Sequence, residues 1–287
     1  MAKAPQNNSV TSIKQRLLNL ARQGQRDFGI VLLAYALERL LFRLSISEHR
    51  ESFILKGGML VTLWTIDQSR FTRDIDFLSV GSDDGNTLID IFNNILSIDT
   101  EDGLKFDTTA LTATQIRDDK VYGGVRLKTT AYLDKTKIPI TIDIGFGDSI
   151  TDSEYTIEYP SLLELPSANI RAYSPATVIA EKFQAIVALG LINGRMKDFY
   201  DLWTIPKAQL ISDEEIFEAI SSTFERRQTE IPTERPEGLS SSFTTDEQKS
   251  RQWLAYADSI DLESITLEQI ADEIWLYLEP ICMASKT

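Results

Sequence analysis

The residues of this sequence best suited to chemistry are two aspartates separated by one residue. Asp74 and Asp76 lie in the alternating stretch Phe71–Val80, which predicts a β-strand. Side chains on a strand repeat every second residue, so these carboxylates share one face while Ile75 and Phe77 point to the other. Neighbouring carboxylates repel each other and need a counter-charge. Mg²⁺ suits this role, because it prefers carboxylate oxygens and keeps waters that a substrate phosphate can displace.

A strand, a glycine pair and a helix precede the two aspartates and must position them. The apolar run Phe53–Leu55 predicts a short buried strand, and Lys56–Gly58 ends it. Met59–Ile66 then predicts a short apolar helix, and Asp67–Ser69 a loop. The simpler alternative is an acidic edge strand beside an ordinary glycine turn.

A third aspartate, Asp143, lies in a block of predicted strands. These strands cover Phe106–Thr114, Tyr122–Tyr132 and Ile138–Gly145, and Lys135–Lys137 is the expected tip of the hairpin between the last two. The isoleucines of the third strand share one face, so Asp143 lies on a polar face, as Asp74 and Asp76 do. By its pattern alone Asp143 could be a solvated residue of an amphipathic strand.

The same block concentrates positive charge. Its basic residues are Arg117, Lys120, Arg126, Lys128, Lys135 and Lys137, opposed by Asp118, Asp119 and Asp134. These residues form either a solvated hairpin face or a contact surface for an RNA backbone or an acidic partner.

Two further charged segments lie in helices predicted for the second half of the chain. Ser174 as N-cap and Pro175 at the first position open a helix that runs to about Leu191 and carries Lys182. The next helix, Arg195–Leu202, has Asp198 and Asp201 on one face. Ion pairing on a helix surface, among Arg195, Lys197, Asp198 and Asp201, is the alternative to a functional role.

Helices account for most of the remaining sequence. They are expected over Ser12–Arg22, from an N-cap at Asp27 to about Leu44, over Thr87–Leu96, from a capping box at Ser212 to about Arg227, over Thr245–Ala257 and over Thr266–Glu279, with a loop at Gln228–Ser242. In the first part of the chain helices alternate with strands, and in the second part only helices are expected. This order predicts an α/β (α+β) protein with a mixed sheet and a helical C-terminal lobe.

The segments Leu55–Gly58 and Arg70–Phe77 together resemble the opening motif of the nucleotidyltransferase superfamily, Gly-Gly followed by Asp-x-Asp. They resemble more closely the toxins of type IV abortive-infection (AbiE-type) toxin–antitoxin systems, a group that includes the mycobacterial MenT toxins. The fifteen-residue spacer Met59–Arg73 is slightly long for the superfamily. The segments Pro175–Lys182 and Arg195–Leu202 resemble the second signature of these toxins.

The resemblance implies a nucleotidyltransferase domain over residues 1–165 and a helical lobe over 166–287 that completes a nucleotide cleft. It implies transfer of a nucleoside monophosphate from an NTP to an acceptor, with tRNA as the expected class, and a DNA-binding antitoxin encoded nearby. The implied residues are Asp74, Asp76 and Asp143 as ligands of Mg²⁺, with Asp143 also as general base; Lys182 and Asp201 as further catalytic residues; and Lys56, Gly57, Gly58, Thr72, Arg73, Lys182 and Asp198 at the nucleotide.

Composition limits the class of protein. The chain has 287 residues, 43% hydrophobic, with a formal net charge of −14, which argues against coating nucleic acid through bulk charge. The single cysteine excludes an internal disulfide, and the single histidine disfavours a mechanism built on a histidine base. The N-terminus lacks an apolar signal core, and the apolar stretch Ile30–Leu37 is shorter than the ~20 residues that span a bilayer. We therefore expect a cytoplasmic protein without a membrane segment.

Two other functions compete with this expectation. A nucleotidyltransferase could modify a small molecule or a protein side chain, and the acidic net charge suits a cationic acceptor. A nucleotide-binding regulator could keep the same scaffold without catalysis, but the presence of Asp74, Asp76, Asp143 and Lys182 argues against that reading.

Overall fold

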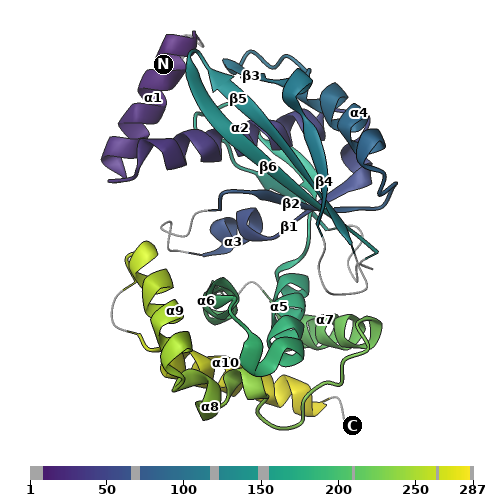
Figure 1. Ribbon diagram of the computed structural model, residues 1–287, viewed down its shortest axis with the longest axis vertical. Coiled ribbons are helices and arrows are strands. Elements are labelled where there is room, and N and C mark those ends of the chain that lie inside the picture. The colour runs from purple at the N-terminus through teal and green to yellow at the C-terminus, as the bar shows by residue number, and fades with distance from the viewer. Residues whose placement is uncertain are drawn as a thin grey trace. The chain divides into compact units, whose positions relative to one another are not determined.

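The computed structural model describes residues 9–65, 72–116, 123–147, 155–208, 211–262 and 265–284 (Figure 1). The chain forms two compact units. The first comprises Met1–Met59, Phe71–Asp148 and Glu154–Ala172, and the second Leu60–Arg70, Ser149–Ser153 and Tyr173–Thr287.

A mixed sheet forms the centre of the first unit. Its strands are β1 (Phe53–Lys56), β2 (Ile75–Ser79), β3 (Leu104–Phe106), β4 (Thr112–Ile116), β5 (Gly124–Leu133) and β6 (Thr136–Phe146). They follow the order β1-β2-β6-β5-β3, and β4 also pairs with β5. The pair β2–β6 is parallel and the other pairs are antiparallel. The predicted α/β class with a mixed sheet is confirmed.

Aromatic side chains of β1 and β2 pack together on one face of this sheet. The rings of Phe53 and Phe77 lie 5.8 Å apart, and Phe53 also contacts Phe92 of α4 (Gly85–Leu96) at 5.1 Å. Phe77 and Ile75 are fully buried. Because strand side chains alternate, this packing directs Asp76 to the opposite face.

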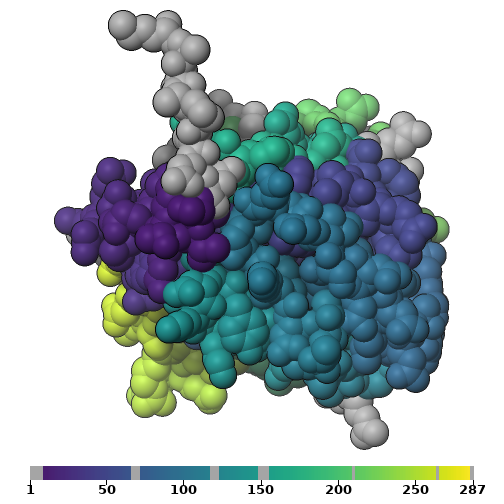
Figure 2. All heavy atoms as spheres, turned by 90° about the horizontal axis from the view of Figure 1, so that it is seen from above, coloured from purple at the N-terminus to yellow at the C-terminus, as the bar shows by residue number. Residues whose placement is uncertain are grey.

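Two helices precede the sheet, as predicted. In α1 (Val10–Gln23) the side chain of Ile13 is fully buried, and Lys14 donates a 2.8 Å hydrogen bond to Thr136 at the start of β6. In the space-filling view of Figure 2, the purple atoms of the N-terminal helices lie against teal atoms of the sheet. Asp27 caps α2 (Phe28–Ser45) by accepting from the Ile30 amide, and α2 packs on β6 and β8 (Ala168–Arg171).

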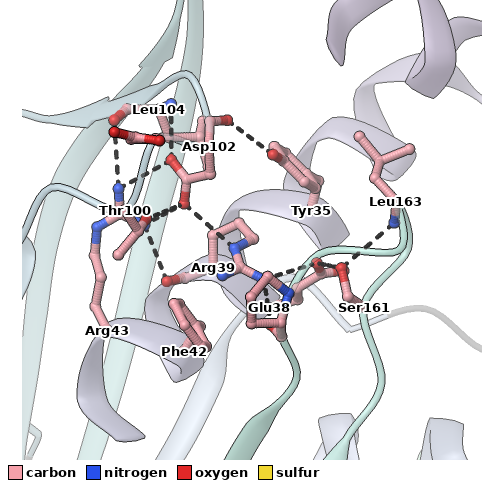
Figure 3. A network of polar contacts seen from close by, with 12 residues as sticks. Tyr35, Glu38, Arg39, Phe42, Arg43, Thr100, Asp102, Leu104, Ser161 and Leu163 are labelled. Carbon is pink, nitrogen blue, oxygen red and sulfur yellow. Dashed lines mark hydrogen bonds and ion pairs between the residues drawn. The ribbon is translucent and has the colours of Figure 1, made fainter. Parts of the chain in front are cut away.

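Charged residues of α2 lie in a buried network (Figure 3). The Arg43 guanidinium donates to both carboxylate oxygens of Asp102, at 2.6 and 3.0 Å, and Arg39 donates to the same carboxylate at 3.3 Å. Burial alone would raise the pKa of Asp102, but the hydrogen bonds and charge of Arg43 lower it. Glu38 accepts hydrogen bonds from the Ser161 hydroxyl at 2.7 Å and the Leu162 amide at 2.8 Å. The network thus ties α2 to two distant loops.

The expectations about the strands were wrong or incomplete in four places. The strand predicted over Phe71–Val80 begins at Ile75 and ends at Ser79, so Asp74 lies just before it and not on it. The strand predicted over Phe106–Thr114 is broken into β3 and β4, because Asp107 accepts from the Ala110 amide and closes a 3-10 turn (Thr108–Ala110). The hairpin tip is shorter than predicted, since Leu133 already pairs with Thr136. A second, two-stranded sheet of β7 (Thr156–Tyr159) and β8 was not predicted at all.

The described part of the second unit is helical. Its longer helices are α5 (Pro175–Leu189), α6 (Met196–Thr204), α7 (Asp213–Arg226), α9 (Glu247–Ser259) and α10 (Leu267–Ala284). The predicted N-cap at Ser174 and capping box at Ser212 are confirmed. The predicted loop Gln228–Ser242 is wrong in its second half, where buried Leu239 and Phe243 anchor a 3-10 turn (Glu237–Leu239) and α8 (Ser241–Thr244).

By length and composition alone, Pro175–Ile192 could cross a membrane, but 61% of this segment is buried within the protein. A core helix that packs against its neighbours passes the same test, and α5 packs on α6 and α7.

Candidate active site

Three half-buried carboxylates converge on one face of the mixed sheet. Asp76 of β2 lies directly opposite Asp143 of β6, and Asp74 immediately precedes β2. Each of the three aspartates offers an oxygen, and these oxygens lie within 4.8 Å of one another. The Thr72 hydroxyl donates a 2.7 Å hydrogen bond to Asp74 Oδ1. The parallel β2–β6 pairing thus brings together residues far apart in sequence.

These donors fit a divalent cation. All three are carboxylates, which are the hard oxygen ligands that Mg²⁺ prefers, and their spacing allows one ion to contact each of them. Carboxylates so close together also repel one another, and a cation relieves that repulsion.

The acidic cluster belongs to a row of charges that crosses the sheet. Lys56 of β1 pairs with Asp76, Asp76 with Asp143, and Asp143 with Arg126 of β5. Residues in register across strands share a face, so the two central carboxylates have a cation on either side.

Arg126 binds Asp143 with both arms of its guanidinium. Its Nε donates to Oδ1 at 2.7 Å and its Nη2 to Oδ2 at 2.6 Å. The hydrogen bond to Asp143 is the main cause that raises the pKa of Arg126, and the charges of Asp74 and Asp76 add to it. Arg126 was expected in a basic patch, but here its guanidinium serves the acidic cluster.

The glycine pair lies against the same carboxylates. Gly57 has a positive φ of 72°, and a Cβ at this position would lie 2.1 Å from Asp76 Oδ2. Only glycine therefore fits the turn between β1 and α3 (Gly58–Trp64). Lys56, Gly57 and Gly58 are consecutive here, so the strand–glycine–helix arrangement predicted from the sequence is present.

The other residues expected near the nucleotide differ in exposure. Thr72 is half-buried on Asp74, while Arg73 is exposed. Arg70 and Phe71, which belong to the same motif, lie outside the described residues, as do Arg117 and Lys120 of the basic block.

A separate charged cluster lies in the second unit. Lys182 of α5 bridges two aspartates of α6, at 2.5 Å from Asp198 Oδ1 and 2.7 Å from Asp201 Oδ2. The side chains of Asp198 and Asp201 are 4% and 0% exposed, and Arg195 also contacts Asp198, at 2.8 Å. The alternative was ion pairing on a helix surface. The ion pairs of Asp198 and Asp201 are present, but they do not lie on a surface, because both carboxylates are buried. Lys197 is exposed.

Sequence reasoning missed the Arg126–Asp143 pair because it misplaced the hairpin tip. A turn centred on Thr136 would pair Arg126 with Phe146, whereas the shorter turn pairs it with Asp143. The residue that could have located the turn from the sequence is Asp134, which adopts a positive φ of 54° there. Aspartate is among the residues that tolerate this conformation, and it is common in tight hairpin turns.

Comparisons with known proteins identify related sequences and folds. A family model described as nucleotidyl transferase AbiEii toxin, type IV TA system, matches residues 39–273. No curated protein matches the sequence significantly. The crystal structure of JHP933 from Helicobacter pylori aligns with 14% identity and a TM-score of 0.48, covering 90% of this chain and 93% of that one. A proposed nucleotidyltransferase from H. pylori aligns with 15% identity and a TM-score of 0.48, covering 88% and 94%.

Proposed function

The chain belongs to the AbiEii family of nucleotidyl transferase toxins from type IV toxin–antitoxin systems, and from this we propose an Mg²⁺-dependent enzyme that transfers a nucleoside monophosphate from an NTP to RNA. We propose tRNA as the acceptor. The observation that supports metal-dependent transfer is the convergence of Asp74, Asp76 and Asp143, with oxygens within 4.8 Å of one another.

In this proposal the three aspartates hold the metal and the triphosphate is placed beside them. Bound Mg²⁺ would neutralise phosphate charge and make the attacking hydroxyl more acidic. Asp143 would take the proton of that hydroxyl as general base, because it lies on the same sheet face as the other two acids.

Polar groups around the acids would hold the phosphates. We assign this role to the side chains of Lys56, Thr72 and Arg73 and to the backbone N–H groups of Gly57 and Gly58. Gly57 suits it because its backbone closely approaches Asp76. In the second unit we assign nucleotide contacts to Lys182 and Asp198 and a catalytic role to Asp201. There Lys182 is held in place by the two buried carboxylates.

Exposed lysines of the β5–β6 hairpin favour a polyanionic acceptor. Lys128 and Lys137 project on the face that carries Asp143, and Lys135 lies in the turn. All three are exposed, in a chain whose net charge is −14. The same net charge would favour a small cationic acceptor, which is the second candidate. Lys128, two residues along β5 from Arg126, lies beside the acids and would repel such a molecule, while Lys135 and Lys137 extend the positive charge toward the far end of the hairpin, so RNA is preferred.

Membership of a type IV system also implies an antitoxin partner. We propose that this partner is an AbiE-type DNA-binding protein encoded nearby and that both act in the cytoplasm.

The test is transfer by the purified chain. Each labelled NTP is incubated with Mg²⁺ and either total RNA or no RNA, for the parent, Asp74→Ala, Asp76→Ala and Asp83→Ala. Asp83 is an exposed acid of the loop after β2, so its variant controls for the lost charge. We expect labelled RNA with the parent and Asp83→Ala, and none with the other two variants, whose thermal melts should show an intact fold.

Other outcomes would contradict the proposal. Label on protein in the absence of RNA would indicate a side-chain acceptor. NTP binding without any transfer would indicate the regulator, and full activity of Asp74→Ala or Asp76→Ala would contradict the metal site.

A further inference from the structure

Arg126 is bound to Asp143, the carboxylate that the proposed metal needs as a ligand. Both oxygens of Asp143 accept hydrogen bonds from its guanidinium, at 2.7 and 2.6 Å. A bidentate arginine–carboxylate pair is among the stronger polar contacts in proteins, because both bonds are charge-assisted and the two groups match in shape. A cation that coordinates Asp143 must therefore displace at least part of this contact.

The guanidinium and a divalent cation would neutralise the same charge. Arg126 binds Asp143, and the oxygens of Asp143, Asp74 and Asp76 lie within 4.8 Å of one another, so its positive charge acts on the entire acidic cluster. Two cations that stabilise one anionic cluster and share one ligand disfavour each other, through Coulomb repulsion and through competition for the oxygens of Asp143.

The side chain of Arg126 has room to leave. It is 40% exposed, whereas Asp143 is 17% exposed, so the guanidinium reaches solvent on one side. On release it would remain within a side-chain length of the acidic cluster, where the proposed triphosphate binds. Phosphate oxygens offer the same bidentate, charge-assisted contact that Asp143 provides.

Resting on the proposed function above, we propose that Arg126 is a built-in competitor of the divalent cation at Asp143. The guanidinium holds the third carboxylate until the metal binds, and metal binding transfers it from Asp143 to a phosphate of the bound NTP. Arg126 is thus a positioning residue for the metal site and a contact for the triphosphate. It offsets part of the negative charge of the acidic cluster before the metal binds and makes metal and nucleotide binding cooperative.

The test measures the affinity of the full-length protein for Mn²⁺, a paramagnetic substitute for Mg²⁺, from the loss of the free-ion resonance signal. The variants are Arg126→Gln, Arg126→Lys and Lys128→Gln. Lys128 is the matched control, because it lies on the same strand and face but pairs with Thr141 rather than an acid. We expect Arg126→Gln to bind Mn²⁺ at least about fivefold more tightly, Arg126→Lys to be intermediate, and Lys128→Gln to change affinity less than about twofold.

A second measurement follows the released guanidinium. With Mn²⁺ saturating, Arg126→Gln should bind a non-hydrolysable ATP analogue at least about fivefold more weakly than the parent, since it lacks the phosphate contact. Arg126→Lys keeps the charge and should recover part of this affinity. It also keeps the test decisive if the glutamine variant does not fold.

Several results would overturn the inference. Unchanged or weaker Mn²⁺ binding in both Arg126 variants would show that Arg126 only orients Asp143, and equal gains in Arg126→Gln and Lys128→Gln would show a general charge effect. If the parent does not bind Mn²⁺, or if its Mn²⁺ binding survives in Asp76→Asn, the proposed function fails and this inference fails with it.

Discussion

At the scale of single residues, the environment of Lys182 in the structure differs from the one expected from the sequence. From the sequence it is a lysine on a capped helix, where an exposed side chain would contribute little to stability. In the structure its ammonium lies between Asp198 and Asp201, and its side chain is only 14% exposed. Removal of a partner from a buried ion pair leaves the other charge desolvated without compensation, which is costly.

We therefore predict that Lys182→Ala lowers stability as well as nucleotide use. Asp201 would lose its lysine at a fully buried position, and the expected decrease in the free energy of unfolding is about 3 to 5 kcal/mol. Urea unfolding of the parent and the variant measures it. Lys197→Ala, an exposed lysine on the same helix as Asp198, is the control and should change stability by less than about 0.5 kcal/mol. Equal stability of the two variants would show that the buried pair contributes nothing.

At the scale of elements, α2 is held by buried charges as well as by apolar packing. Burial raises the pKa of Glu38 to about 7, although hydrogen bonds from Ser161 and Leu162 and the charge of Arg39 oppose that rise. The unfolded chain, with an ordinary glutamate pKa, loses this proton at lower pH than the folded protein. Glu38 therefore adds stability at low pH, and that contribution is lost as the pH rises from about 4.5 to about 7.

This linkage predicts how Glu38→Gln should behave. The amide stays uncharged at every pH, so the stability of the variant relative to the parent should rise between about pH 4.5 and about pH 7, by on the order of 3 kcal/mol. Chemical denaturation at several pH values measures the difference. Glu158→Gln, at an exposed position of β7, controls for the removal of one negative charge. A constant difference between Glu38→Gln and the parent across this range would contradict a raised pKa.

At the scale of the whole molecule, a net charge of −14 must be reconciled with a polyanionic acceptor. Bulk charge opposes RNA binding, so any contact depends on local clusters of cations. Arg126 is engaged with Asp143, which leaves Lys128, Lys135 and Lys137 as the exposed cations of the described hairpin.

We predict that replacement of these three lysines by serine lowers RNA labelling and flattens its salt dependence. Each lost phosphate contact should reduce the slope of log affinity against log salt by about 0.7, or about 2 in total. RNA binding and labelling over a salt series measure this, and NTP binding should stay unchanged. The control replaces the exposed Lys105, Lys197 and Lys207, which lie outside the hairpin. If both triple variants label RNA as the parent does at every salt concentration, the hairpin lysines are only a solvated face.

The sequence alone determined the local elements and the family. The N-caps Asp27 and Ser174 and the capping box at Ser212 were predictable, because each depends on contacts within a few residues. The alternation around Asp76 and the glycine turn before it are local in the same sense. They were also sufficient to reveal the resemblance to nucleotidyltransferase toxins that the family match over residues 39–273 then confirmed.

Only the tertiary structure decided the partners of the charged residues. The parallel pairing of β2 with β6 sets Asp76 beside Asp143, and no pattern within either strand specifies that pairing. Strand register is discrete, so a hairpin turn centred on Thr136 would place Phe146 and not Asp143 opposite Arg126. Lys182 similarly becomes buried only because α5 packs on α6. Local propensity acts over a few residues, whereas register and burial depend on contacts among residues far apart in the chain.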